Sequence, residues 1–217
     1  QGFDVAVCRA VAAAVLGDSD AIEFVPTTGK TRFTALASGE IDMLARNTTW
    51  TFSRDVDLKF EFVGVNYYDG QGFMAKADLG VSSATELDGA TVCIQTGTTT
   101  ELNLADFFRA NNMSYEAVPV ETGSEAVTNY MAGACDVFTT DRSALAARRA
   151  NMENPNEHVV LPEIVSKEPL GPLVRHGDNN WGDVVRWTLN ALITAEELGV
   201  TAANVAEMAK GTKIPEM

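Results

Sequence analysis

The sequence is poor in histidine and cysteine, and these two shortages remove most metal and nucleophile chemistry. His158 and His176 are the only histidines among 217 residues, and neither lies in a nucleophile–base motif or a metal-ligand cluster. The three cysteines are too few for a disulfide scaffold and lack the spacing of a zinc site. The sequence also lacks the G-x-S-x-G and G-x-G-x-x-G motifs. We therefore expect no metal, no cofactor and no enzyme active site.

Positive charge is scarce as well. The chain has 16 Lys and Arg residues against 30 Asp and Glu residues, which gives a formal net charge of −14. Such a surface repels phosphate backbones and anionic headgroups, so we expect neither nucleic acid nor a membrane surface as a partner. No apolar run approaches the roughly 18–20 residues that a membrane span needs. The chain begins with Gln1 rather than Met, which indicates a longer precursor.

The sequence does contain a regular alternation of short apolar runs and helical stretches, which favours α/β layers. In the first set, helices are predicted at 3–17 and 30–40, strands at 22–26 and 41–45, and one long extended segment at 58–76. In the second set, strands are predicted at 90–96, 115–121 and 136–140, helices at 99–112, 124–134 and 142–151, an extended segment at 158–177 and a long amphipathic helix at 179–199.

The two sets predict two α/β units between which the chain crosses twice. We expect the crossings near Phe73–Ala77 and Glu168–Leu173. Strand–helix–strand repeats favour parallel sheets, whose ligands collect at the carboxyl ends of the strands. Two such units joined by two crossover strands would form a cleft with a hinge.

The stretch "ARNTTWTFSRD", residues 45–55, follows a predicted strand and is rich in polar groups. If the chain turns back here, Arg54 presents its planar donor fork to a carboxylate while Thr49 adds a hydroxyl. The alternative is an ordinary surface arginine that caps a helix. The spacing alone leaves both interpretations open.

The stretch "QTGTTTEL", Gln95 to Leu102, follows a strand and opens a helix. Backbone N–H groups and hydroxyls at a helix start favour an anion, and the missing lysine favours a small carboxylate over a phosphate. A capping box from Thr98 to Glu101 explains the threonines almost as well.

Asp141 ends the strand in "DVFTTDRS". A carboxylate at the end of a parallel strand can pair with an ammonium group, although an N-cap for the next helix is an equal alternative. Together, Arg54, the helix start at residues 98–100 and Asp141 would supply the partners that an α-amino acid needs, since both of its charges must be matched when they lose water.

The cysteines also allow two interpretations. Each of Cys8, Cys93 and Cys135 can be a small buried hydrophobe. Alternatively, Cys93 and Cys135 form a bridge in an oxidising compartment, because each precedes a residue of the expected site by a similar distance on neighbouring strands.

Several long blocks carry a family resemblance: "GFDVAVCRAVAAAVLGD", "RFTALASGEIDMLARNTTWTFSRD", "YYDGQGFM", "CIQTGTTTELNLADFFRANNM" and "HVVLPEIVSKEPLGPLVRHGD". The chain resembles the general L-amino-acid-binding proteins of bacterial ABC importers, which are type II periplasmic solute-binding proteins. The resemblance implies an α/β fold of two lobes, each a mostly parallel sheet flanked by helices, joined by two crossover strands. Lobe one is expected at roughly 1–74 plus 172–217 and lobe two at roughly 75–171. Members of the family extend beyond both ends of this sequence.

The resemblance also implies roles for single residues. The ligand's α-carboxylate is expected at Arg54 and Thr49, with the backbone carbonyl of Asn47 facing the ammonium. On the second lobe the carboxylate clamp falls on Thr98 and Thr99, flanked by Gln95 and Thr100, and the ammonium partner is Asp141. Arg32 matches a contact to acidic side chains, Thr122 matches a pocket residue opposite it, and Gly29 implies a roomy pocket.

The expected function is periplasmic binding of free L-amino acids and their delivery to the membrane permease of an ABC importer, by a monomer without chemistry of its own. Two alternatives remain open. One is a periplasmic enzyme on the same fold, similar to cyclohexadienyl dehydratases. The other is the ligand-sensing domain of a larger receptor.

Overall fold

The computed structural model describes residues 2–211. The helices are α1 (Phe3–Leu16), α2 (Arg32–Ser38), α3 (Thr99–Ala110), α4 (Gly123–Met131), α5 (Arg142–Ala150), α6 (Asn179–Glu197) and α7 (Val205–Gly211). The strands are β1 (Phe60–Phe62), β2 (Tyr67–Asp69), β3 (Gln71–Lys76), β4 (Ala90–Gln95), β5 (Tyr115–Val120), β6 (Val137–Asp141), β7 (His158–Val160), β8 (Glu168–Leu170) and β9 (Leu173–Arg175). None of the described helices combines the length and the hydropathy that crossing a bilayer requires.

The chain forms two compact units. Unit 1 consists of the described parts of Gln1–Phe24, Asp42–Asn66 and Gly171–Met217, and unit 2 consists of Val25–Ile41 and Tyr67–Leu170. The chain therefore crosses between the units at residues 24–25, 41–42, 66–67 and 170–171. The crossing at residues 66–67 precedes the predicted stretch Phe73–Ala77, which lies within β3 and at its end. Residues 25–41 group with unit 2 although we assigned them to lobe one, so the predicted lobe limits of 1–74 with 172–217 and 75–171 stay a prediction.

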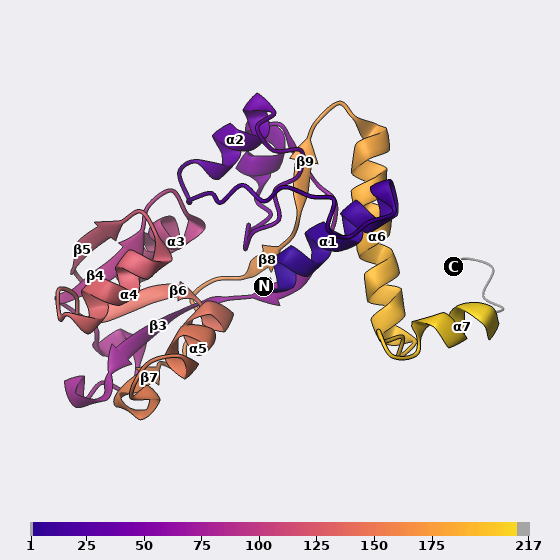
Figure 1. Ribbon diagram of the computed structural model, residues 1–217. Coiled ribbons are helices and arrows are strands. Elements are labelled where there is room, and N and C mark those ends of the chain that lie inside the picture. Colours follow the sequence, from indigo (N-terminus) through magenta and orange to yellow (C-terminus); the bar gives the residue numbers. More distant parts are fainter. Residues whose placement is uncertain (1, 212–217) are drawn as a thin grey trace. The chain divides into compact units, whose positions relative to one another are not determined.

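Unit 2 is built on a five-stranded sheet with the order β5–β4–β6–β3–β7 (Figure 1). Strands β5, β4 and β6 run parallel, as the strand–helix–strand pattern predicts. Strand β3 is antiparallel to both of its neighbours, β6 and β7. The crossings at residues 66–67 and 170–171 adjoin a separate antiparallel pair, in which β2 pairs with β8.

Helices cover both faces of this sheet because successive strand residues point to opposite sides. On one face, Phe73 and Ala75 of β3 pack in a buried cluster with Leu104 and Phe108 of α3. On the other face, Met74 packs in a second cluster with residues of α4 and α5. The central parallel strands β4 and β6 are mostly buried, which explains their near-continuous apolar sequences, whereas the edge strand β5 is largely exposed.

Unit 1 has a smaller sheet. Strand β1 pairs antiparallel with β9, and Leu44 adds a single bridge to Leu173. Val11 of α1 and Val185 of α6 pack with Val63 and Val174 in a buried cluster against these strands. Helix α1 ends at Gly17, whose φ of 73° is the left-handed conformation that glycine adopts without strain.

The predicted helices and the strands of the second set are confirmed, as is the extended segment at 58–76, but two strand predictions for the first set are wrong. Residues 22–26 form no strand in the described structure, and of residues 41–45 only Leu44 makes a β-bridge. The extended segment 58–76 is three strands in three different sheets. Among the described residues, the strands of unit 1 pair antiparallel and not in the mostly parallel sheet predicted for lobe one. A strand requires hydrogen-bonding partners from elsewhere in the chain, and an apolar pattern does not supply them.

Candidate functional site

Arg54 lies in unit 1, in a short π-helix at Ser53–Asp57. Its side chain is 7% exposed, and its Nη1 donates a hydrogen bond to the carbonyl oxygen of Thr49 at 2.8 Å. The chain therefore turns back as the donor-fork interpretation predicts, and the interpretation of Arg54 as a surface residue is wrong. Trp50 braces the turn, because its Nε1 donates to Asp55 Oδ2 at 2.7 Å and its ring stacks on Phe62 at 5.4 Å.

The residues before this turn are held by α1. The half-buried carboxyl of Asp4, in the first turn of α1, is hydrogen-bonded by the side chain of Asn66 and the backbone of Asn47, close to the positive charge of Arg46. Burial raises the pKa of Asp4, and these contacts only partly oppose that rise. The side chain of Asn47 is exposed, whereas the neighbouring Thr48 is fully buried and accepts the N–H of Gly171 at its carbonyl.

At the start of α3 in unit 2, the hydroxyl groups of Thr98 and Thr99 donate hydrogen bonds to other groups of the protein. Thr98 Oγ1 donates to the carbonyl of Gln95 at 2.7 Å and accepts the N–H of Glu101 at 3.3 Å. Thr99 Oγ1 donates to Glu168 Oε2 at 3.1 Å. The capping role of Thr98 is confirmed, although Glu101 Oε2 accepts the N–H of Gly97 rather than that of the cap residue. An anion at this turn would therefore meet backbone N–H groups.

Two further contacts lie near this turn, one of them buried and the other exposed. The carbonyl of Thr100 accepts Gln71 Nε2 at 3.1 Å, and Gln95 Nε2 donates to the carbonyl of Glu121 at 2.8 Å. Thr100 is 6% exposed and Gln71 is fully buried. The ends of β4 and β5 and the start of β3 are thus tied to the first turn of α3.

Asp141 ends β6 and directly precedes α5. It is 5% exposed, and its side chain makes no capping hydrogen bond to α5. The N-cap alternative is therefore wrong for its carboxylate. Asp141 pairs with Gln71 across the sheet, at the end of β6 where the parallel strands finish.

Arg32 and Thr122 belong to unit 2. Arg32 is 2% exposed, and its guanidinium lies 4.8 Å from the ring centre of Phe33. Thr122 caps α4 in a capping box with Glu125. No described contact joins Arg32 to Thr122, so their common role stays a prediction.

The structure shows why residue 29 is a glycine, which the sequence alone does not show. A Cβ at Gly29 would lie 2.7 Å from the carbonyl oxygen of Thr96 and 3.1 Å from Thr98 Cγ2. Gly29 is thus required by the close approach of two backbone segments. Lys30 adds an exposed ion pair with Glu121 at 3.3 Å.

Glu168 is a buried polar residue that was not predicted from the sequence to belong to the site. It is 2% exposed and accepts hydrogen bonds from Thr99 Oγ1 and Asn103 Nδ2, the latter at 2.8 Å. Its signal in the sequence was weak, because one glutamate in the extended stretch "SKEPLGPLV" is typical of a solvated strand. Only the folded chain shows that this side chain points at α3.

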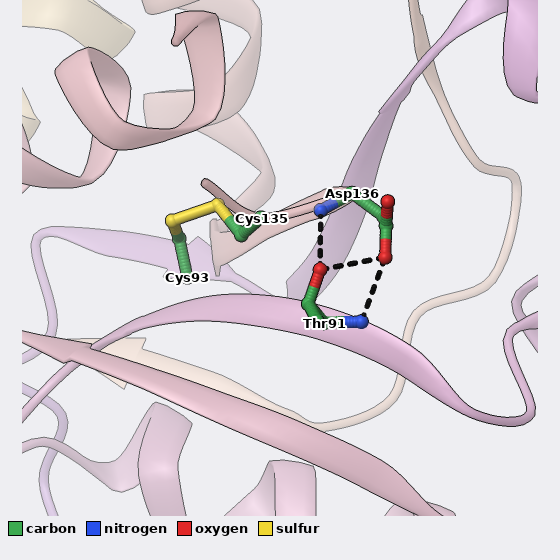
Figure 2. Close-up of a disulfide and its surroundings, with 4 residues drawn as sticks. All are labelled: Thr91, Cys93, Cys135 and Asp136. Atoms are coloured by element: carbon green, nitrogen blue, oxygen red, sulfur yellow. Dashed lines mark hydrogen bonds between the residues drawn. A yellow bond between two sulfur atoms is a disulfide. The ribbon is translucent and has the colours of Figure 1, made fainter. Parts of the chain in front are cut away.

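The structure contains the disulfide Cys93–Cys135, with a Cα–Cα distance of 5.6 Å (Figure 2). The bridge interpretation is thereby confirmed, and Cys8 is a free thiol. Figure 2 also shows Thr91 and Asp136 beside the disulfide: Asp136 Oδ2 accepts the N–H and the hydroxyl of Thr91.

Two further features of the described residues concern metal binding and cavities. No group of three or more His, Cys, Asp or Glu side chains is placed to hold a metal ion in residues 2–211. A cavity of about 720 Å³ in unit 2 lies along α5, β2 and the segment from Pro155 to Ile164. None of the predicted ligand-binding residues lines this cavity. In chemical terms, the predicted residues offer guanidinium and N–H donors for a carboxylate and one buried carboxylate for an ammonium group.

Comparison with known proteins adds three findings. The family of bacterial extracellular solute-binding proteins, family 3, matches residues 1–203. The Glutamate/glutamine/aspartate/asparagine-binding protein BztA of Rhodobacter capsulatus is 65% identical over 217 residues, which are 100% of this chain and 64% of that protein. The General L-amino acid-binding periplasmic protein AapJ of Rhizobium johnstonii is 59% identical over 95% of this chain and 61% of that protein. The chain thus spans less than two thirds of these relatives.

Among solved structures, an ABC transporter/periplasmic binding protein from Brucella ovis with glutathione bound has a TM-score of 0.94 and 56% identity. It covers 99% of this chain, and the chain covers 67% of it. This likeness confirms the type II periplasmic binding fold that the sequence predicts.

Proposed function

Because the chain belongs to the bacterial extracellular solute-binding proteins, family 3, we propose that it binds free L-amino acids in the periplasm and delivers them to the permease of an ABC importer. It does so as a monomer and without turnover. The support is the resemblance to two relatives whose names describe amino-acid binding. The ligand is a zwitterion, so the protein must match one carboxylate and one ammonium as both lose water.

The observation that carries the proposal is the burial of Arg54 beside Thr49. A guanidinium that is 7% exposed needs hydrogen-bond acceptors, and one is the carbonyl of Thr49. The planar guanidinium has five N–H donors and binds a carboxylate through two parallel hydrogen bonds. Arg54 therefore binds the α-carboxylate, with Thr49 holding the guanidinium in place and Asn47 accepting from the ammonium.

Unit 2 supplies the remaining groups. The first turn of α3, at Thr98, Thr99 and Thr100 with Gln95 beneath it, offers backbone N–H groups and the positive end of the helix dipole to the carboxylate. Asp141, which is 5% exposed at the end of β6, accepts from the ammonium.

Arg32 and Thr122 are assigned to the side chain of the ligand. The names of the relatives describe acidic, amide and general L-amino acids, and the Brucella ovis protein holds glutathione. The γ-glutamyl end of glutathione retains a free α-carboxylate and α-ammonium, so it presents the same pair of charges as a free amino acid. A site that recognises this pair accommodates different side chains.

The first experiment is a thermal-shift screen of the parent protein against the twenty amino acids and glutathione. A ligand at 100 times its dissociation constant stabilises the folded state by about 2.7 kcal/mol. We expect several L-amino acids to raise the midpoint, with no consumption of ligand in a parallel turnover assay. A parent protein that responds to none of them contradicts the proposal.

The second experiment is calorimetry on Arg54→Ala, Asp141→Ala and Arg32→Ala with L-glutamate and L-alanine. Loss of Arg54 or Asp141 leaves a ligand charge unmatched, which costs about 2–5 kcal/mol, or roughly a 30-fold to several-thousand-fold loss of affinity. Arg32→Ala is expected to weaken L-glutamate only. Arg109→Ala is the control, because Arg109 is exposed and pairs with Asp106 on α3. If Arg54→Ala binds L-alanine as tightly as the parent, the carboxylate lies elsewhere.

A further inference from the structure

The two strands that adjoin the crossings at residues 66–67 and 170–171 carry carboxylates in matching positions. Strand β2 pairs antiparallel with β8, and Asp69 is the direct partner of Glu168. Two carboxylates directly opposite each other are an unfavourable cross-strand pair. Each of them, however, accepts hydrogen bonds from the start of a helix. One helix, α3, carries Thr99, and the other, α5, directly follows Asp141.

Glu168 is bound to the start of α3. Its Oε2 accepts from Thr99 Oγ1 at 3.1 Å, and its Oε1 accepts from Asn103 Nδ2 at 2.8 Å and from Ser166 Oγ at 2.5 Å. Thr99 is the first residue of α3, and Asn103 lies one turn later on the same side. A buried carboxylate with three donors is a rigid attachment, because losing any one donor weakens the compensation of a charge in a site that is 2% exposed.

Asp69 is bound to the start of α5 in the same way. Its Oδ1 accepts the N–H of Gly70 at 2.8 Å and the N–H of Ser143 at 3.4 Å, and its Oδ2 accepts the hydroxyl of Ser143. Ser143 lies two residues after Asp141, in the first turn of α5. The carboxylate thereby supplies the side-chain acceptor for the first turn that Asp141, in the cap position, does not supply.

The hydroxyl of Thr99 has one proton, and that proton is donated to Glu168. Towards a ligand, Thr99 therefore contributes its backbone N–H and not its hydroxyl. The position of that N–H depends on the contact between Thr99 and Glu168, which in turn depends on β8.

We propose that Glu168 and Asp69 are positioning residues for amino-acid binding, each fixing the first turn of one helix to a crossover strand. The two helices are α3, which carries Thr99, and α5, which directly follows Asp141. Glu168 acts through Thr99 on the carboxylate contacts of α3, and Asp69 acts through Ser143 on Asp141. A change in the backbone of the β2–β8 pair is thus transmitted to both helix starts. The inference rests on the proposed function, since it assigns how the groups of that site are held.

The test compares each residue with a matched carboxylate that makes similar bonds away from α3 and α5. For Glu168→Gln the control is Glu163→Gln, because Glu163 accepts from Ser83 Oγ at 2.6 Å and from the N–H of Ala84 at 2.9 Å. Calorimetry with L-glutamate is expected to show about a 10-fold loss of affinity for Glu168→Gln. Glu163→Gln is expected to stay within about 2-fold of the parent.

For Asp69→Asn the control is Asp136→Asn, because Asp136 Oδ2 also accepts the N–H and the hydroxyl of one residue, Thr91. The unfolding midpoints without ligand are measured for all variants. If these carboxylates only stabilise the fold, their substitution lowers the unfolding midpoint in variant and control alike. If they position ligand-binding groups, the affinity for L-glutamate falls only in Asp69→Asn and Glu168→Gln.

A double-mutant cycle separates action through Thr99 from a direct effect. Thr99→Val removes the hydroxyl and keeps the shape, so Thr99→Val combined with Glu168→Gln is expected to bind no more weakly than the weaker single variant. Additive losses, or a Glu168→Gln protein within 2-fold of the parent, overturn the inference and leave the proposed function intact. Should Glu168→Gln not fold, Thr99→Val alone must show the loss of affinity. A parent protein that binds no amino acid overturns both.

Discussion

Reduction of the Cys93–Cys135 disulfide is expected to lower the free energy of unfolding of unit 2 without changing its fold. The bond closes a sequence separation of 42 residues, which contains α3, β5 and α4. In the chain-entropy description a loop of this length stabilises the folded state by about 4 kcal/mol, because it restricts the unfolded chain. Both cysteines are almost fully buried, at 0% and 1% exposure.

The reduced protein is expected to fold because other contacts join the same strands. Val92 and Cys93 of β4 pair with Val137 and Phe138 of β6. Just outside the disulfide, the N–H of Asp136 donates to the carbonyl of Thr91 at 3.0 Å. The register of β4 and β6 therefore does not depend on the sulfur–sulfur bond.

The measurement is urea unfolding followed by circular dichroism, with and without a phosphine reductant, and thiol titration confirms the redox state. Cys8→Ala is the background, so that every free thiol counted comes from the pair. Reduction without substitution avoids the cavity that alanine would leave at a buried site. A change below about 1 kcal/mol with both thiols shown to be free would refute the entropic reasoning. Mass spectrometry that finds two free thiols in the unreduced protein would refute the bond itself.

Three further predictions concern single residues. Burial lowers the pKa of His158, so the unfolded chain binds the proton more readily and stability should fall as the pH drops below about 6.5; His158→Gln should flatten that slope in pH-dependent urea unfolding. Burial raises the pKa of Cys8 to about 11, so iodoacetamide at neutral pH should label it slowly in the folded protein and quickly in urea. Gly29→Ala should cost about 1–3 kcal/mol in urea unfolding, because its Cβ meets the carbonyl of Thr96, whereas Lys30→Ala, which removes an exposed ion pair, should cost less than about 1 kcal/mol.

The sequence predicts unit 2 well because its signals are local. The start of α3 follows from Thr98 as a cap, and the end of α2 follows from Gly39, whose φ is 79°. Strands β4, β5 and β6 alternate with helices and have apolar sequences of the expected length. The predictions for unit 1 failed where pairing is decided by distant residues, as at 22–26, which has the composition of a strand and no strand partner in the described structure.

The residues of the candidate site show the same difference between local signals and distant contacts. Arg54 and Asp141 were found from their places after strands, and their burial agrees with that selection. Glu168 and Gln71 were missed, because the importance of each depends on a bond to α3 from far along the chain. The reason for Gly29 was also missed, since a close approach of two backbones leaves no pattern in either segment. Sequence spacing identifies candidate ligand-binding residues more readily than the residues that would hold them in place.

The β2–β8 pair also has a consequence for the order of folding. In unit 1, Phe62 of β1 pairs with Leu173 of β9 although the segment from Tyr67 to Leu170 lies between them in the sequence. Tyr67 and Leu170 are themselves direct partners, so once β2 and β8 have paired, the intervening segment acts as a short loop. The entropic cost of pairing β1 with β9 then depends only on the few residues that separate these strands from β2 and β8, because the cost of closing a loop depends on the number of free residues in it. We therefore expect the inserted segment to fold first and the discontinuous unit 1 to complete afterwards, at little entropic cost for its long sequence separation.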